Sequence, residues 1–286
     1  LFEDLTVASE TQPGTLYVVA TPIGNLEDMT LRAMRVLRET DVIAAEDTRH
    51  TRKLLSHFDI HTPMVSLHDY STSKVVESLV GRLLAGESVA EVSDAGTPGV
   101  SDPGYALTAA VVAAGIPVVP IPGASALLAA LVGSGLPMDR FRFVGFLPRA
   151  SKERRAALRD LASASETLVF FEAPHRLRRM LADMADVLGP RAACAARELT
   201  KVHEEFIRAP LNRLADMVAE PVRGEWTLVV GGSVRQAPAD EAASWEQDLK
   251  GRLEAGESLR DATKAVVEAA GLPRKDVYAV ALRLRD

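Results

Sequence analysis

Short apolar runs alternate with amphipathic stretches from the start of the chain to about residue 232. Runs of apolar and β-branched residues predict strands, and regularly spaced apolar residues such as Leu31, Met34 and Leu37 predict helices between them. The first five predicted strands cover 16–20, 42–45, 64–67, 89–92 and 118–121. Regular alternation of strand and helix is typical of an α/β fold, which we therefore expect.

A second set of predicted strands covers 141–147, 167–171, 192–196, 205–207 and 226–230. These strands contain more aromatic residues and are less plainly parallel than the first five, so we expect a mixed sheet. We predict a boundary between two α/β domains, 13–122 and 123–232, at Pro122-Gly123, after a tail of residues 1–12.

The remainder of the chain predicts helices. Residues 233–243 show no periodicity and predict a linker to a domain of residues 244–286. Helices are expected over 244–255, 258–270 and 273–284, the second opening with a capping box of Ser258 and Asp261. Two short helices joined by a tight turn indicate a helix-turn-helix-like domain, and a helical cap on the main body is an equal alternative.

Composition narrows the class of protein. With 286 residues and 47% hydrophobic residues, the chain can bury a core in each of two domains. Its single cysteine, Cys194, excludes a disulfide framework, and the histidines lack metal-ligand spacing, so we predict no metal.

No export signal is recognisable, and a reducing cytoplasmic setting fits best. The uncharged stretch 105–138 is interrupted by glycine and proline, which favours a buried core over a membrane span.

Three loops rich in glycine and proline follow predicted strands, at 21–28, 93–104 and 121–125. Because the carboxyl ends of parallel strands meet at one edge of a sheet, these loops predict a small-molecule pocket. Neither G-x-G-x-x-G nor a P-loop is present, which argues against dinucleotide and P-loop nucleotide binding. Ser125 lacks the G-x-S-x-G context of a serine hydrolase. For any single loop, an ordinary turn without a ligand is the alternative.

The formal net charge of −6 argues against nucleic-acid binding through bulk charge, so such a role needs local basic patches. Basic residues gather at 49–53, 142–159 and 175–179, and together they predict a localised polyanion-binding surface. A solvated helix face is the alternative for each segment. Phe141, Phe143 and Phe146 interleave with the start of the second segment, but alternating aromatic residues in a predicted strand favour a core position over base stacking.

Seven segments, in order, resemble the ribosomal RNA small subunit methyltransferase I family, bacterial cytidine ribose 2′-O-methyltransferases of the tetrapyrrole methylase superfamily. The similarity runs from about residue 13 to the C-terminus. The matching segments are GTLYVVATPIGNL at 14–26, AEDTR at 45–49 with Leu54-Leu55, SDAGTPGVSDPG at 93–104, PGAS at 122–125, FEAPHR at 171–176, RELTK at 197–201 and GEWT at 224–227.

The resemblance implies two α/β domains with S-adenosyl-L-methionine in the cleft between them, a small helical tail and a homodimer. It also implies methylation of the 2′-hydroxyl of one cytidine in the decoding region of 16S rRNA, within the small ribosomal subunit. The residues that match the family's cofactor motifs are Pro22, Gly24, Asp94, Ala95, Gly96, Pro98, Ser101, Asp102, Pro103, Ser125, Ala126, Glu172, Ala173, Pro174, Gly224, Glu225, Trp226 and Thr227.

The implied reaction is an in-line displacement at the methyl carbon, in which the enzyme mainly positions the reactants. Glu198, Lys201 and Asp47 are the candidates for assisting proton loss, although Glu198 and Lys201, three residues apart, also suit a structural ion pair. The predicted RNA contacts are Arg49, Arg52, Lys53, Arg149, Lys152, Arg154, Arg155 and Arg176. A tetrapyrrole C-methylase and a non-enzymatic rRNA-binding assembly factor are the alternatives.

Overall fold

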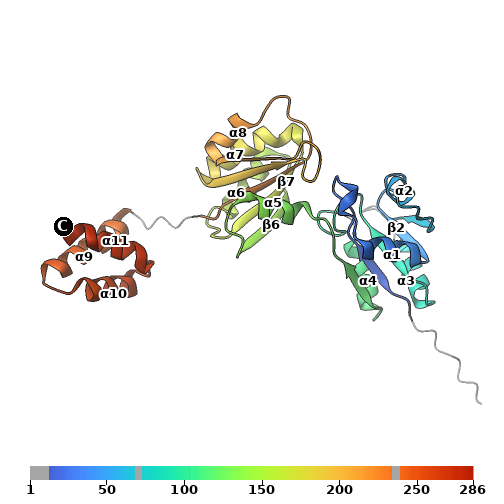
Figure 1. Cartoon of the computed structure of the whole chain (residues 1–286), viewed down its shortest axis with the longest axis horizontal. Coiled ribbons are helices and arrows are strands. Elements are labelled where there is room, and N and C mark those ends of the chain that lie inside the picture. Colours follow the sequence, from blue (N-terminus) through green and yellow to red (C-terminus); the bar gives the residue numbers. More distant parts are fainter. Residues whose placement is uncertain (1–12, 68–72, 103, 234–238, 286) are drawn as a thin grey trace, which may run out of the picture. The chain divides into compact units, whose positions relative to one another are not determined.

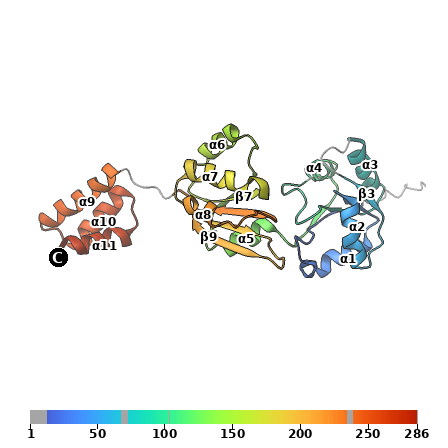
Figure 2. The same cartoon turned by 90° about the horizontal axis from the view of Figure 1, so that it is seen from above.

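The computed structural model divides the chain into two compact units, Leu1–Ser233 and Val234–Asp286 (Figures 1 and 2). It describes residues 13–67, 73–102, 104–233 and 239–285. A search of these residues for helices long and apolar enough to cross a membrane finds none.

The first sheet of the first unit is parallel, with strand order β3-β2-β4-β1-β5. Its strands are β1 (Leu16–Val19), β2 (Val42–Ala45), β3 (Met64–Ser66), β4 (Val89–Val92) and β5 (Val118–Ile121). Every residue of the central strands β2 and β4 is buried, because helices cover both faces of a parallel sheet. The connecting helices are η1 (Leu26–Asp28), α1 (Leu31–Glu39), α2 (Thr48–His57), α3 (Ser73–Leu84) and α4 (Tyr105–Ala113).

The second sheet has the order β6-β7-β10-β8-β9 and is mixed, as the sequence predicted. Only the β6–β7 pair is parallel among its ladders. The strands are β6 (Phe141–Phe146), β7 (Thr167–Glu172), β8 (Ala192–Arg197), β9 (Glu205–Pro210) and β10 (Trp226–Val230). Strand β9 continues past the predicted end at residue 207 because its pairing with β8 runs on to Ala192 and Pro210.

Helices cover both faces of this second sheet. One face packs its largest core against α6 (Ser151–Asp160), α7 (Leu177–Leu188) and α8 (Leu211–Met217). The other face packs against α5 (Ala126–Ser134), with Val169, Cys194 and Val229 buried in that layer. A short turn of helix, η2 (Pro174–Arg176), joins β7 to α7. The expected α/β fold is therefore confirmed.

The second unit has its own small core, formed by Leu249, Ala262, Val266, Val277 and Ala281. Its helices are α9 (Ala239–Glu254), α10 (Leu259–Ala270) and α11 (Arg274–Arg285). The predicted linker extends too far, because α9 begins at residue 239 within it. Acidic residues and alanines suit the first turn of a helix without producing an apolar stripe.

Ser258 is the N-cap of α10, and it bonds to Asp261, the other residue of the predicted capping box, through its side chain. The Ser258 hydroxyl accepts a hydrogen bond from the Asp261 amide at 3.1 Å and donates one to the Asp261 carboxylate at 2.6 Å.

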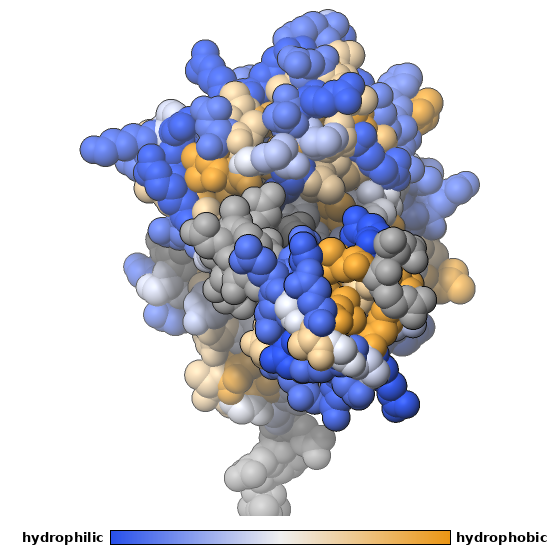
Figure 3. Space-filling view, turned by 90° about the vertical axis from the view of Figure 1, so that its left-hand side faces the viewer, coloured by the Kyte–Doolittle hydropathy of each residue, from blue (hydrophilic) through white to orange (hydrophobic). Residues whose placement is uncertain are grey.

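Figure 3 shows one face of the molecule, where hydrophilic residues predominate and hydrophobic residues gather in small groups. Tyr278 and Leu282 on α11 are among the exposed apolar side chains of the second unit.

Candidate functional site

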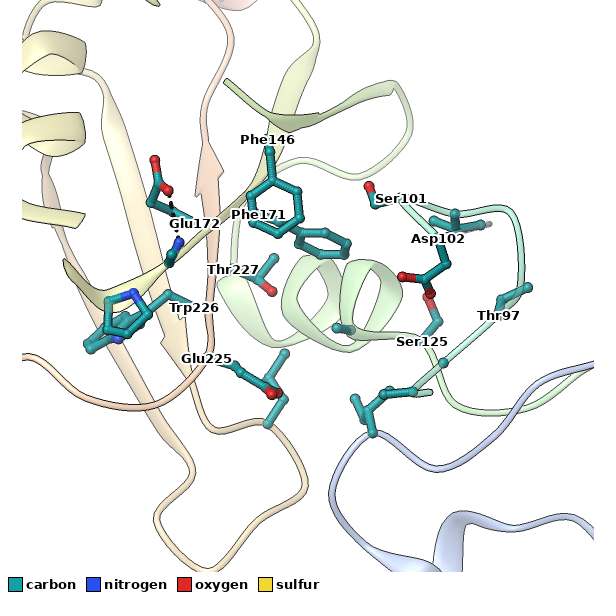
Figure 4. Close-up of a pocket in the computed structure, with 18 residues that line it drawn as sticks. Thr97, Ser101, Asp102, Ser125, Phe146, Phe171, Glu172, Glu225, Trp226 and Thr227 are labelled. Atoms are coloured by element: carbon teal, nitrogen blue, oxygen red, sulfur yellow. Dashed lines mark hydrogen bonds between the residues drawn. The ribbon is translucent and has the colours of Figure 1, made fainter. Parts of the chain in front are cut away.

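A cavity of about 360 Å³ lies where the loops of the first sheet meet the strand ends of the second sheet (Figure 4). Both sheets belong to the same compact unit. The lining residues are Ile23, Ala95, Gly96, Thr97, Val100, Ser101, Asp102, Ser125, Ala126, Phe146, Phe171, Glu172, Ala173, Pro174, Leu199, Glu225, Trp226 and Thr227.

The loops that follow β1 and β4 are tied together at the cavity. Thr21 and Gly96 exchange backbone hydrogen bonds of 2.8 and 3.1 Å, and the Thr21 hydroxyl donates to the Ser93 carbonyl at 3.2 Å. Gly96 has a φ of 87°, a left-handed conformation that glycine adopts without strain. The pairing therefore fixes the backbone of residues 95–97 in the cavity wall.

Helix α5 presents its N-terminus to the cavity. Ser125 is the N-cap, and its hydroxyl accepts a hydrogen bond from the Leu128 amide. Ser125 and Ala126 both line the cavity. Because unpaired amides and the helix dipole make an N-terminus favourable for anions, this part of the wall suits a carboxylate.

Strands β7 and β10 present two different faces near the cavity. Phe171 and Thr227 are paired in register, as are Glu172 and Trp226. In Figure 4 the Phe146 and Phe171 rings lie together, and the Glu172 carboxylate and the Trp226 ring lie away from these two rings. Glu172 and Trp226 are therefore cavity residues whose side chains are mostly buried in the protein.

Three side chains form an ion-pair network at the edge of the cavity. The Lys201 Nζ lies 3.0 Å from Glu198 Oε1 and 3.0 Å from Glu225 Oε2, and the Glu225 amide donates to Glu198 at 3.0 Å. The amide bond and Lys201 lower the pKa of Glu198, despite partial burial. Partial burial opposes the charge of Lys201, but its bonds to both carboxylates raise the pKa of the ammonium. The ion pair of Glu198 and Lys201 is thus formed, with Glu225 as a third member.

The aliphatic part of Lys201 crosses the loop after β1. A Cβ atom on Gly24 would collide with the Lys201 side chain, so this close approach requires glycine at position 24.

Asp47 caps α2 and does not line the cavity. Its carboxylate accepts hydrogen bonds of 2.8 Å from the Arg49 amide and from the Arg49 guanidinium, and these bonds hold the pKa of Asp47 well below its usual range. The Asp47 amide in turn donates to Asp94 at 3.2 Å. Asp47 and Asp94 therefore join the loops after β2 and β4, and the predicted catalytic role of Asp47 has no support from its position.

Most residues matched to cofactor motifs lie in the cavity wall. Those that line it are Ala95, Gly96, Ser101, Asp102, Ser125, Ala126, Glu172, Ala173, Pro174, Glu225, Trp226 and Thr227. Those that do not are Pro22, Gly24, Asp94, Pro98 and Gly224. Pro103 is outside the described residues.

Sequence reasoning missed one polar residue of the wall, Thr97, and five apolar ones, namely Ile23, Val100, Phe146, Phe171 and Leu199. Each lies within a few residues of a predicted one, so position at a strand end was the available signal. Within the part of the chain that is described, no group of three or more His, Cys, Asp or Glu residues could hold a metal ion.

The basic residues fall into two groups. Arg49, Arg52, Lys53, Arg149 and Lys152 are exposed. Arg154 is only 5% exposed, and its guanidinium lies 2.6 Å from the Asp183 carboxylate. The prediction of an RNA contact by Arg154 is therefore wrong, because an enclosed guanidinium cannot reach a phosphate.

Two further arginines are engaged in internal ion pairs. Arg155 is half-buried and shared between Asp183 and Asp186 at 2.8 and 2.9 Å. Arg176 lies 3.1 Å from Glu172 and donates to the Leu147 carbonyl at 2.8 Å. Neither is placed as a freely solvated cation.

Comparisons with known proteins agree with this geometry. Residues 15–215 match the family model of Tetrapyrrole (Corrin/Porphyrin) Methylases. The chain is 51% identical over 274 residues to the ribosomal RNA small subunit methyltransferase I of Micromonospora olivasterospora, covering 95% of this chain and 87% of that protein. It is 46% identical over 271 residues to the protein of the same name from Halalkalibacterium halodurans, covering 93% of each.

Solved structures of lower identity share the fold. A uroporphyrin-III C-methyltransferase from Thermus thermophilus, complexed with S-adenosyl homocysteine, has a TM-score of 0.53 and 24% identity over 76% of this chain and 97% of that chain. A diphthine synthase has a TM-score of 0.58 and 16% identity over 77% of this chain and 91% of that chain.

Proposed function

The chain belongs to the ribosomal RNA small subunit methyltransferase I family, and from this we propose that it methylates the 2′-hydroxyl of one cytidine ribose in the decoding region of 16S rRNA. It is a methyltransferase with S-adenosyl-L-methionine as its methyl donor. The observation that carries the proposed target is 51% identity, over 95% of the chain, to a relative named for this RNA.

The residues of the cavity fit the donor. The loop backbone beside the paired Gly96 offers hydrogen-bonding groups, the N-terminus of α5 suits a carboxylate, and Phe171 and Leu199 offer apolar contact for an adenosyl group. When bound, S-adenosyl-L-methionine supplies an electrophilic methyl group on a sulfonium sulfur. Ala95, Gly96, Ser125 and Ala126 are the residues that we propose to hold it.

The protein contributes mainly by positioning the ribose oxygen for an in-line displacement. Because its ion pairs with two carboxylates favour the ammonium form of Lys201, we assign the role of base to another residue. In the proposed mechanism Glu198 and Lys201 fix Glu225, whose carboxylate is in the cavity wall and accepts the 2′-hydroxyl proton.

Glu225→Gln tests this assignment, with Asp47→Asn as the matched control outside the cavity. We expect the glutamine variant to lose at least about tenfold in kcat with little change in KM, as for removal of a general base. The asparagine variant retains a helix cap and keeps its kcat. Equal kcat for wild type and Glu225→Gln would contradict a role of Glu225 as base.

The exposed side chains of Arg49, Arg52, Lys53, Arg149 and Lys152 are the proposed phosphate contacts.

We propose the assembled small subunit as the substrate, because a single target in a large RNA is best recognised by its shape. We also propose the cytoplasm as the location of the protein. A homodimer is part of the same proposal. Exposed apolar side chains on α4 and α5, such as Tyr105, Val112 and Val132, support an oligomer.

Methyl transfer from labelled S-adenosyl-L-methionine to small subunits from a strain lacking this gene tests the proposed function. Nucleoside analysis of the rRNA is expected to show 2′-O-methylcytidine at one site. Label on a base, or no label in RNA from a protein that still binds the donor, would contradict the proposed target. Label in a tetrapyrrole would identify a C-methylase instead.

A further inference from the structure

Phe146 is an aromatic residue that the core of the protein does not enclose. Its side chain is 56% exposed although it lines the cavity. It makes a T-shaped contact with Phe171, with ring centroids 5.7 Å apart and an interplanar angle of 62° (Figure 4). An aromatic surface is thus available to a ligand at the cavity.

A β-bulge at the end of β6 turns Phe146 toward the cavity. Phe143 pairs with Val169 and Phe146 pairs with Phe171, and the register shifts between Phe143 and Gly145, whose φ is 72°. In a regular strand, residues 143 and 146 would point to opposite faces of the sheet. The extra residue places both on the face of Phe171, which both rings contact.

The bulge also brings β6 against the loop after β4. A Cβ atom on Gly145 would lie 3.3 Å from the Ser101 hydroxyl, and Ser101 lines the cavity. Phe146 is therefore next to a wall that we assign to the methyl donor.

Two arginines hold the segment that follows Phe146. Arg176 donates to the Leu147 carbonyl at 2.8 Å, and Arg154 donates to the Arg149 carbonyl at 2.9 Å. The side chains of Arg149 and Lys152 remain exposed. A fixed backbone thus presents a half-exposed aromatic ring within six residues of two exposed cations. Aromatic rings beside basic groups are the usual binding surface for unpaired nucleotides.

We propose that Phe146 is the stacking surface for the nucleobase of the methylated nucleotide, and that Arg149 and Lys152 contact the phosphates beside it. This inference rests on the proposed function. A ribose hydroxyl reaches a donor held in a cavity only when its nucleotide leaves the RNA stack, and the unstacked base then needs a new aromatic partner. Because every base has a π-face, Phe146 contributes binding and orientation and does not select cytidine.

The test compares Phe146→Leu and Phe146→Tyr with a control, Phe141→Leu. Phe141 lies on the same strand, is 41% exposed and does not line the cavity. Methylation of small subunits lacking the modification gives kcat and KM, and calorimetry gives the affinity for S-adenosylhomocysteine. We expect Phe146→Leu to raise KM at least about fivefold, the loss typical of one stacked base. Phe146→Tyr and Phe141→Leu stay within about twofold of wild type, and all variants keep their S-adenosylhomocysteine affinity.

Two results would overturn the inference. The first is Phe146→Leu behaving like Phe141→Leu in KM. The second is loss of S-adenosylhomocysteine affinity in Phe146→Leu, which would assign the ring to the donor and leave the proposed function intact. If the wild type methylates no RNA, the proposed function fails separately. Anisotropy with a fluorescent single-stranded RNA then decides the stacking role, because equal affinity of wild type and Phe146→Leu would exclude it.

Discussion

The two sheets of the first unit each bury a glutamate, and they hold it differently. Glu172 in the second sheet accepts a 2.8 Å hydrogen bond from the Ala173 amide and lies 3.1 Å from Arg176. Glu91 in the first sheet is 2% exposed and accepts a 3.4 Å bond from Thr108. Within the described ranges, one carboxylate oxygen of each glutamate, Oε1 of Glu91 and Oε2 of Glu172, has no hydrogen-bond partner, so the two sites differ in the cation beside Glu172.

The pKa values follow this difference. Burial raises the pKa of Glu91 to about 7, with only the weak bond from Thr108 opposing it. Burial also raises the pKa of Glu172, but the Ala173 amide and Arg176 oppose the shift. An arginine thus lies beside the buried glutamate of the second sheet. The buried glutamate of the first sheet is instead stabilised in its protonated, neutral form.

The largest expected effect comes from removing the cation beside a buried acid, Asp183 on α7, which covers the second sheet. Arg154→Met leaves Asp183 buried with only the shared Arg155, so we expect a loss of roughly 3 kcal/mol in the free energy of unfolding. Denaturant unfolding measures it. Lys152→Met, on the exposed face of the same helix, is the control and changes the stability by less than about 0.5 kcal/mol. Equal stabilities of the two variants would show that Arg154 is not a structural residue.

The second effect concerns the pH dependence of stability through Glu91. Its folded pKa of about 7 lies above the ordinary glutamate value of 4.5, so the unfolded chain releases this proton first as the pH rises. Stability from this group is complete below pH 4.5, falls between pH 4.5 and 7, and is lost above. The loss is about 3 kcal/mol at about 1.4 kcal/mol per pH unit.

Glu91→Gln removes this titration while keeping the shape of the side chain. We expect the difference in unfolding free energy between variant and wild type to shift in favour of the variant by about 3 kcal/mol from pH 4.5 to pH 8. Denaturant titrations at both pH values give this difference. A difference that does not change with pH would mean that Glu91 ionises normally in the folded protein.

The smallest effect comes from making Glu172 resemble Glu91. Arg176→Met removes the cation, so the pKa of Glu172 rises further. Because the folded pKa then lies still further above the unfolded one than in the wild type, the variant loses more stability than the wild type as the pH increases. We expect a deficit of about 2 kcal/mol at pH 8 that narrows toward pH 5. A deficit that is the same at both pH values would assign the loss to the Leu147 carbonyl bond instead.

The parts of the site that follow a regular rule were predictable from sequence. Parallel strands bring their carboxyl ends to one edge, which is why Gly96, Ser101 and Ser125 were expected at a pocket and line one. The spacing of Glu198 and Lys201 likewise predicted a shared face, and they form an ion pair.

The parts that depend on an irregularity or on a distant partner were not predictable. The position of Phe146 depends on the bulge at Gly145, which shifts the alternation of side chains that the sequence pattern assumes. The burial of Arg154 depends on Asp183, 29 residues away, and Glu225 joins Lys201 across 24 residues. Glu91 lies in an otherwise apolar strand, and nothing in the neighbouring sequence indicates how a buried carboxyl group is stabilised there.

Because several arginines around Phe146 are paired with carboxylates of the protein, they affect how strongly RNA affinity depends on salt concentration. Phosphate contacts release condensed counterions, so the logarithm of affinity falls with the logarithm of salt concentration in proportion to the number of cations engaged. Arg154, Arg155 and Arg176 already neutralise carboxylates inside the protein. The salt dependence of RNA binding is therefore shallower than the count of basic residues in this region suggests.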